Sequence, residues 1–340
     1  MNMRSHYLRK VLGSIAASAL LLSSLILSPS CVDVKEYGSD VSLEGMTLEN
    51  APVTDCSTST SPLRNILMYS LLDIKWHWMQ DWALGDSYKV FWDLPERIEL
   101  GSEEHLSFVD DMRRLFLCSG SHGAYVNLID ENVDFIIDSR DVSRNEVVYC
   151  KEKGVELLTK PIAKDALIFI VNKDNPVSTI TSSQVRGIYT GKITNWKELG
   201  GDDLAIDPYV RDQDSGSQEK METLVMKGEK MKDFPLFTGG SMIFPYASVT
   251  HDKAGIGYTP YYYCTSMVRN LDEYKILRID GVMPQESTIS KETYPFCSNI
   301  YAAIRKSEHP SSFAHKLYDY MDSKAGVQII KESGYIPMVR

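Results

Sequence analysis

The sequence predicts an α/β protein built on parallel sheets, with enough chain for two domains. Segments that read as strands alternate with segments that read as helices, and strands separated by helices imply parallel pairing. The 340 residues are 43% hydrophobic, which supports ordinary buried cores. Open parallel sheets bind ligands beyond the carboxyl ends of their strands, so we expect functional residues in the loops that follow strands.

The predicted elements are defined by composition and by helix start signals. Five runs rich in branched or aromatic residues are predicted strands, at 133–137, 166–171, 205–210, 255–258 and 298–304. Six segments with helical patterns are predicted helices, at 62–74, 123–131, 182–189, 218–226, 311–321 and 324–333. No internal repeat or low-complexity block interrupts this alternation.

The first 30 residues have the layout of a secretory signal peptide. Basic residues precede an apolar run over 11–27, which is too short and too plainly bounded for a good membrane span. The following Ser28-Pro29-Ser30-Cys31 resembles the lipobox of bacterial lipoproteins, in which the cysteine is acylated. We expect an exported lipoprotein anchored at Cys31, with residues 31–50 as a tether, in the periplasm or on the cell surface. The alternative is ordinary cleavage with a spare cysteine.

Charge and cysteine usage exclude several classes of partner. Without the leader, 33 basic residues stand against 46 acidic ones, which argues against nucleic acid and against binding to anionic lipid surfaces. The remaining cysteines contain no Cys-x-x-Cys pair, so no zinc or other metal site is predicted. Cys264 with Cys297 and Cys56 with Cys118 are candidate disulfides, and the sequence does not decide between them.

One helix start is suited to binding an oxyanion. Arg211 lies four residues ahead of Ser215-Gly216-Ser217. Ser215 and Gln218 have capping-box spacing, glycine lets the backbone approach a ligand, and the first amides of the helix point outward at the positive end of its dipole. Arg211 would add a two-pronged charged donor. Many helices with such caps bind nothing, so an ordinary cap is the alternative.

Two other predicted helices begin in the same way. Thr58-Ser59-Thr60-Ser61 precedes Pro62, which suits the first helical position, and Ser119-Gly120-Ser121-His122-Gly123 precedes the next helix. If the three starts converge, they form a site of neutral donors around an anion, with Arg211 supplying positive charge. The alternative is that all three are routine caps.

Several motifs stand in the order of a known family. They are Pro161-Ile162-Ala163-Lys164-Asp165-Ala166, Tyr189-Thr190-Gly191-Lys192-Ile193-Thr194-Asn195-Trp196, Arg211 with Ser215-Gly216-Ser217, Gly255-Ile256-Gly257-Tyr258 and Gly334-Tyr335-Ile336-Pro337. In these the chain resembles the substrate-binding proteins of ABC-type phosphate importers, from about Asp55 to the C-terminus.

The resemblance implies a two-lobed periplasmic binding protein of type II, each lobe a mostly parallel sheet flanked by helices, with the ligand in the cleft between lobes. Lobe one would comprise 51–165 and 300–340, and lobe two 166–299, with crossings near 163–171 and 298–304. It implies a monomer without enzymatic activity or cofactor that captures inorganic phosphate or a related oxyanion for an ABC permease and ATPase. The ligand-binding positions carried over are Thr60, Ser61, Ser121, Ser139, Arg140, Arg211, Ser215, Gly216 and Ser217.

One position departs from the family pattern. Known phosphate binders carry an aspartate in the loop after the strand that matches 134–137, and it accepts the proton of hydrogen phosphate. Ser139 stands there, with Asp138 before it and Arg140 after it. Because a serine hydroxyl can donate or accept, phosphate selectivity is left open, and Arg140 would favour a larger or more highly charged anion. The alternative for Arg140 is a salt bridge to Asp138 or Asp141.

A tryptophan-rich segment and two rival functions complete the predictions. Residues 73–118 hold four of the five tryptophans. We expect these to pack in the core, with an inserted hairpin or helix; the alternative is that they are stacking platforms for a sugar or an organic phosphate. A serine hydrolase would use Ser121 in Ser119-Gly120-Ser121-His122-Gly123, but adjacent side chains diverge, so His122 cannot serve as its base. None of the candidate bases at 77, 105, 251, 309 and 315 lies in a recognisable context. A surface adhesin or scaffold with the same fold is the other alternative.

Overall fold

The computed structural model describes residues 43–81, 87–268 and 272–338. The predicted signal peptide, Cys31 and most of the predicted tether lie outside the described residues, as does Trp82. The described residues belong to one compact unit. Among the described residues, no helix is both long enough and apolar enough to cross a bilayer.

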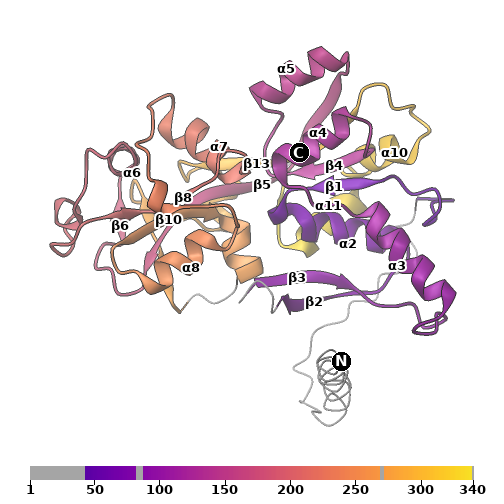
Figure 1. The fold of residues 1–340 in the computed structure, drawn as a ribbon, viewed down its shortest axis with the longest axis horizontal. Coiled ribbons are helices and arrows are strands. Elements are labelled where there is room, and N and C mark those ends of the chain that lie inside the picture. Colours follow the sequence, from indigo (N-terminus) through magenta and orange to yellow (C-terminus); the bar gives the residue numbers. More distant parts are fainter. Residues whose placement is uncertain (1–42, 82–86, 269–271, 339–340) are drawn as a thin grey trace, which may run out of the picture. The chain divides into compact units, whose positions relative to one another are not determined.

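One sheet runs through this unit, with the strand order β1-β4-β13-β5-β10-β7 (Figure 1). Its strands are β1 (Thr54–Cys56), β4 (Phe135–Asp138), β13 (Cys297–Arg305), β5 (Leu157–Asn172), β10 (Gly255–Pro260) and β7 (Asp207–Pro208). The outer pairs, β1 with β4 and β10 with β7, are parallel, and the inner pairs that involve β5 or β13 are antiparallel. Parallel pairs with helical crossovers therefore flank an antiparallel centre.

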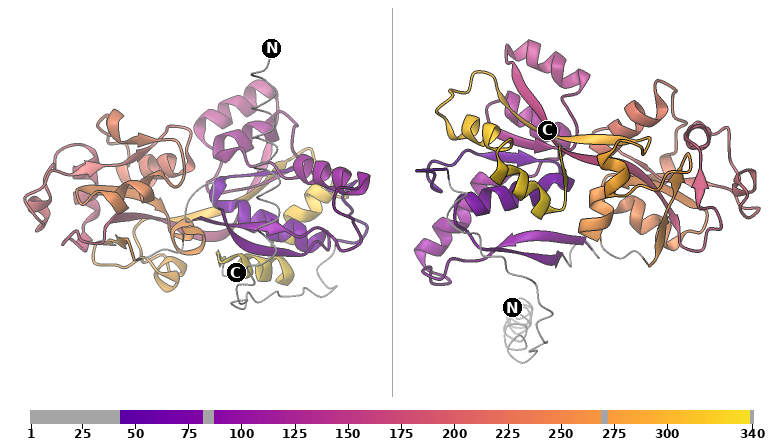
Figure 2. Two further views of the ribbon diagram at one scale, coloured as in Figure 1. Left: turned by 60° about the horizontal axis from the view of Figure 1, so that its bottom comes forward. Right: turned by 180° about the vertical axis from the view of Figure 1, so that it is seen from behind.

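The long strand β5 changes partners along its length. Its residues 157–166 pair with β13, whereas 167–171 pair with β10. The short strands β14 (Ile336–Pro337) and β11 (Tyr274–Ile276) pair with its first and second parts. Figures 1 and 2 show β5 and β13 passing from the α4 side of the sheet to the α8 side. We propose that lobe one and lobe two divide here, at the predicted boundary after residue 165.

Helices cover both parts of the sheet. In lobe one they are α2 (Ser61–Leu71), α3 (Glu103–Leu115), α4 (Gly120–Ile129), α5 (Arg144–Lys153), α10 (Phe313–Tyr320) and α11 (Lys324–Ser333). In lobe two they are α6 (Ser182–Tyr189), α7 (Gly216–Lys220), α8 (Phe244–His251) and α9 (Glu286–Ser290). The predicted bounds of α6 and α11 are confirmed to the residue.

Two predicted elements differ from the structure. The strand predicted at 205–210 is divided into β7 and β8 (Val210–Arg211), and Pro208 lacks the amide that a continuous ladder needs. The helix predicted over 218–226 begins earlier as α7 and continues as a π-helical turn at Met221–Met226. β8 pairs with β9 (Thr238–Gly239), and β6 (Thr179–Ile180) with β12 (Arg278–Ile279).

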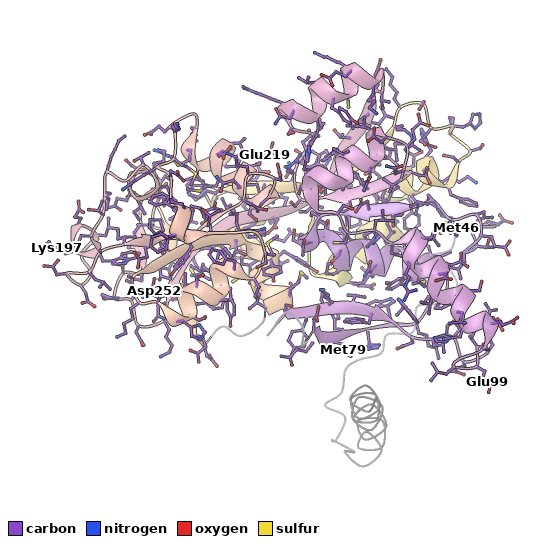
Figure 3. All side chains as sticks on the ribbon, viewed as in Figure 1. Met46, Met79, Glu99, Lys197, Glu219 and Asp252 are labelled. Carbon is purple, nitrogen blue, oxygen red and sulfur yellow. The ribbon has the colours of Figure 1, made fainter. Side chains whose placement is uncertain are left out.

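The tryptophan-rich segment contains a hairpin and a helix. Strands β2 (Trp76–Asp81) and β3 (Ser87–Trp92) pair antiparallel, with Trp76 opposite Trp92. Trp76, Trp78 and Trp92 are partly buried against the main core, and the ring of Trp92 lies 5.1 Å from that of Phe108 on α3. The structure agrees with the core-packing interpretation, while Met79 on this hairpin is exposed (Figure 3).

Candidate functional site

The first predicted loop directs two of its hydroxyls into lobe one. Thr60 donates to the carbonyl of Ile137 at 2.6 Å, and Ser61 donates to that of Thr58 at 2.9 Å. Neither hydroxyl is therefore free to donate to a ligand. Ser59, directly before Thr60, has a buried hydroxyl with no hydrogen-bond partner among the described residues. Sequence reasoning passed over Ser59, although it belongs to the same hydroxyl cluster.

The second loop places Ser121 against the end of β4. Ser121 is buried in the first turn of α4, and its hydroxyl is hydrogen-bonded to the carboxyl of Asp138. His122 points elsewhere, because its ring Nδ1 lies 3.1 Å from Glu146 Oε1. The Ser121 environment thus lacks the serine–imidazole contact that a hydrolase needs.

The start of α7 lies directly against these lobe-one serines. A Cβ built on Gly216 would stand 2.5 Å from Ser121 Oγ and 2.9 Å from Ser139 Oγ. Both distances are shorter than real Cβ atoms show, so glycine permits this approach without displacing either hydroxyl. Three predicted site residues, Ser121, Ser139 and Gly216, are therefore brought together from both lobes.

The cap of α7 is half of the predicted capping box. Ser215 Oγ accepts from the amide of Gln218 at 3.3 Å. The reciprocal bond was a wrong prediction, because the Gln218 side chain donates to Glu222 at 2.9 Å and accepts from the hydroxyl of Tyr258. Tyr258 also accepts from the amide of Arg211 at 2.9 Å. This network fixes α7 relative to β10.

Arg211 and Ser217 converge on one sulfur atom. Arg211 is buried, and its Nε and Nη2 donate to the carbonyls of Gly239 and Gly240 at 3.0 and 2.9 Å. Its Nη1 lies 3.4 Å from Met242 Sδ, and Ser217 Oγ lies 3.8 Å from the same sulfur. Burial lowers the pKa of Arg211, although Asp212 opposes this. Because a thioether is a weak acceptor, both donors have capacity left for a stronger one.

Arg140 is engaged by carboxylates on both lobes. Its Nη1 and Nη2 donate to Glu146 at 2.8 and 2.6 Å, and its Nε lies 2.7 Å from Glu219 on α7. Burial lowers the pKa of the guanidinium, but the Glu146 bonds outweigh it and the net pKa is raised. The structure favours the salt-bridge interpretation, with partners other than the predicted Asp138 and Asp141. Arg140 thus connects the lobes and does not point at an open anion site.

Three buried charged groups beside the site were not singled out in the sequence. Asp138, Asp165 and Lys220 each have a side-chain atom without a hydrogen-bond partner among the described residues. Burial raises the pKa of Asp138 to about 7, raises that of Asp165 and lowers that of Lys220. Lys220 interacts electrostatically with both carboxylates. A lysine inside the core has no sequence signature, so only the structure could reveal this cluster.

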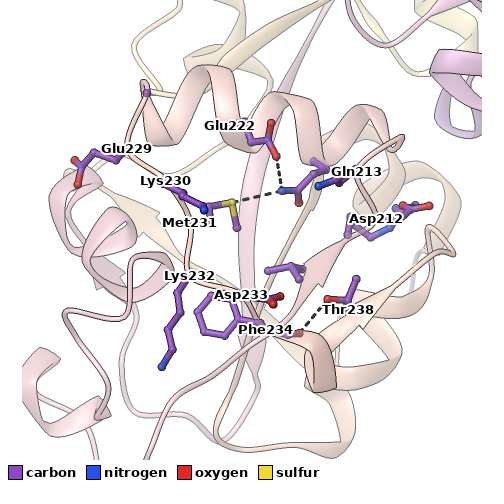
Figure 4. Close-up of a pocket in the computed structure, with 14 residues that line it drawn as sticks. Asp212, Gln213, Glu222, Glu229, Lys230, Met231, Lys232, Asp233, Phe234 and Thr238 are labelled. Carbon is purple, nitrogen blue, oxygen red and sulfur yellow. Dashed lines mark hydrogen bonds and ion pairs between the residues drawn. The ribbon is translucent and has the colours of Figure 1, made fainter. Parts of the chain in front are cut away.

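A separate pocket lies within lobe two, on the other side of α7. Its volume is about 940 Å³, and residues 228–234, Arg211 and Gln218 line it (Figure 4). Its wall also carries four carboxylates, at positions 212, 222, 229 and 233. Three basic side chains, those of Arg211, Lys230 and Lys232, line it as well, so the pocket is of mixed charge and slightly acidic.

Comparison with known proteins identifies the family of the chain. A family model described as PBP superfamily domain matches residues 117–324. Protein SphX of Synechococcus elongatus is 24% identical over 65% of this chain and 67% of its own length. The phosphate-binding protein PstS of Borreliella burgdorferi is 25% identical, over 64% of this chain and 77% of its own. The phosphate-binding protein PstS of Bacillus subtilis is 28% identical, over 57% of this chain and 63% of its own length.

Solved structures show the same fold. A structure with bound phosphate from Clostridium perfringens, described as a phosphate ABC transporter substrate-binding protein, has a TM-score of 0.60 at 23% identity and covers 85% of this chain and 99% of its own. An ABC-type phosphate transport receptor from Vibrio cholerae has a TM-score of 0.57 at 20% identity, and the match covers 84% of this chain and 99% of the receptor. These likenesses confirm the predicted two-lobed α/β fold. The chain belongs to the PBP superfamily, as the order of its motifs predicted.

Proposed function

We propose that this protein binds phosphate or a closely related oxyanion between its lobes and passes it to an ABC permease with its ATPase. The contact of Gly216 with Ser121 and Ser139 carries the proposal, because it brings a helix start of lobe two and two hydroxyls of lobe one to one point. The similarity to phosphate-binding proteins supports the same ligand class. Ser215, Ser217 and Arg211 complete the site from lobe two.

The donors suit a tetrahedral anion. The first amides of α7 and the hydroxyls of Ser139 and Ser217 are neutral donors that stabilise negative charge without a basic surface. Arg211 adds the positive charge, and an oxyanion is a far better acceptor for it than the sulfur of Met242. The Arg140–Glu219 ion pair favours the closed arrangement of the lobes. Binding without chemistry follows from this donor set.

The bond between Asp138 and Ser121 supplies a basis for selectivity. A serine hydroxyl has one proton, and an ionised Asp138 takes it as a hydrogen bond. Ser121 Oγ then presents only lone pairs toward Gly216. These accept the proton of hydrogen phosphate but repel the oxygens of sulfate, which carry no proton. Ser121 with Asp138 thereby replaces the carboxylate that the family pattern places at residue 139.

This arrangement predicts the effect of Ser121→Ala on selectivity. Phosphate loses its acceptor, whereas sulfate loses a repulsive neighbour, so the ratio of phosphate to sulfate affinity falls at least about tenfold. Calorimetric titration of both anions at pH 8, where Asp138 is mostly ionised, measures this ratio. An unchanged ratio would show that Ser121 does not discriminate between the anions.

The proposal also predicts the effect of Arg211→Ala. A buried charge-assisted hydrogen bond contributes about 1.5–3 kcal/mol, so phosphate affinity falls at least about tenfold. The matched control is Arg278→Ala, which removes an exposed arginine of the same lobe and leaves affinity unchanged. Equal phosphate affinity in Arg211→Ala and the unmodified protein would overturn the site assignment.

The cellular setting follows from the same proposal. We infer an exported, monomeric binding protein without enzymatic activity, lipidated at Cys31 and held near its permease by the segment up to residue 50. The PBP superfamily membership and the phosphate-binding relatives favour this role over a surface adhesin or a hydrolase. Metabolic labelling with a palmitate analogue, lost in Cys31→Ser, tests the anchor.

A further inference from the structure

We propose that Cys56 and Cys118 form a disulfide that joins the first two loops of the binding site. Cys56 is the last residue of β1, and the first loop begins at Ser57. Cys118 precedes Ser119, where the second loop leads into α4. A bond between them would tie together the chain segments that place Ser59 and Ser121.

The backbone holds the two cysteines side by side. Thr54 and Phe116 form a parallel bridge, and the amide of Leu117 donates to the carbonyl of Thr54 at 2.9 Å. Extending this register by two residues places Cys56 opposite Cys118. Neighbouring strands lie about 4.7–4.9 Å apart, within the Cα separation of about 4.4–6.8 Å that disulfides span.

Side-chain contacts keep this register on both sides of the pair. Cys56 Sγ lies 3.6 Å from the carbonyl of Leu117, and the amide of Ser119 donates to Asp55 at 2.8 Å. Arg64 donates to the carbonyl of Leu117 at 2.8 Å. The two cysteines of the other candidate pair are placed differently: Cys264 contacts the hydroxyl of Tyr274, and Cys297 contacts backbone carbonyls. The structure thus favours one of the two pairs that the sequence left open.

The two thiols differ in a way that suits exchange with an external oxidant. Cys118 is exposed, and its hydrogen bond with Cys56 lowers its pKa to about 7, whereas burial raises the pKa of Cys56. The thiolate of Cys118 attacks a sulfur of a disulfide oxidant, such as oxidised glutathione or a protein dithiol oxidase, and releases one thiol. Cys56, losing its proton, then attacks Cys118 Sγ and releases the second. Two cysteine thiols are oxidised, and one external disulfide is reduced to two thiols.

The test equilibrates the purified protein with oxidised glutathione, blocks free thiols and maps the disulfides by mass spectrometry. We expect a peptide that links Cys56 to Cys118 and a protein mass lower by two hydrogen atoms. The melting temperature should rise by several degrees and fall back to its original value when the disulfide is reduced. The matched control variant Cys297→Ser should keep this link. Cys118→Ser should lose both the link and the rise in melting temperature.

Quantitative alkylation of both Cys56 and Cys118 after this treatment, or a link from either to another cysteine, would overturn the proposal. Mapping on the unmodified protein decides the question even if Cys118→Ser folds poorly. The measurement requires no anion, so its outcome is separate from that of the proposed binding function.

Discussion

Gly216→Ala weakens phosphate binding by about a hundredfold or more and leaves the fold intact. The new Cβ would stand 2.5 Å from Ser121 Oγ and 2.9 Å from Ser139 Oγ, so the lobes cannot close to their present distance. At least two donors then fail to reach the anion, and two charge-assisted bonds account for about 3 kcal/mol or more. Alanine is a better helix former than glycine by about 1 kcal/mol, so unfolding requires no less denaturant.

Two further variants separate a steric effect from a general one. In Gly240→Ala the added Cβ meets its nearest neighbour, Asp212, at an ordinary 3.7 Å, so affinity stays unchanged. In the double variant Gly216→Ala with Ser121→Gly the 2.5 Å contact is gone, and part of the lost affinity returns. Tight phosphate binding by Gly216→Ala alone would place the anion elsewhere.

Asp138→Asn makes the protein more stable at alkaline pH. Burial raises the folded-state pKa of Asp138 to about 7 from its usual value of 3.8. The folded state therefore holds an extra proton between about pH 4 and pH 7, and stability is lost as the pH rises through this window. The loss is of the order of 4 kcal/mol once Asp138 is ionised. An asparagine cannot ionise and so avoids this loss, but its buried amide lacks an acceptor, which costs about 1–3 kcal/mol. The net gain in unfolding free energy is therefore about 1–3 kcal/mol.

Denaturant unfolding at several pH values measures this effect. The difference in unfolding free energy between Asp138→Asn and the unmodified protein should grow from pH 4 to pH 8. Other groups near Asp138, among them Arg140, Glu146, Tyr125 and Lys220, are common to both proteins. Asp174→Asn changes an exposed carboxylate and serves as the control, because its difference in unfolding free energy should not vary with pH. If the difference in unfolding free energy between Asp138→Asn and the unmodified protein did not vary with pH, the raised pKa of Asp138 would be contradicted.

Local signals in the sequence were enough for much of the fold. Helix α6 is bounded by a full capping box at Thr181 and Gln184, and α11 ends at a left-handed Gly334, so both ends can be predicted from neighbouring residues. The donor-rich helix starts were likewise visible. The approach of the second start to the third was not, since it depends on β5 and β13 carrying the chain between lobes.

Long-range partners were beyond prediction from one sequence. Arg140 pairs with Glu146 six residues away and with Glu219 in the other lobe. The hydroxyl-rich helix start at Thr60 and Ser61 gave no hint that both hydroxyls would bond inside lobe one. Lys220 follows Gly216 by about one helical turn and looks like a surface residue in the sequence, yet it is buried between two aspartates that lie far away along the chain.

A crystal structure of the purified protein grown with phosphate tests the central claim most directly. We predict one anion whose oxygens accept from the first amides of α7, from Ser217 and from Arg211, with Ser121 and Ser139 on its lobe-one side. Met242 would turn away from Arg211. Phosphate found only in the pocket lined by residues 228–234, or absent while the lobes remain closed, would contradict the account.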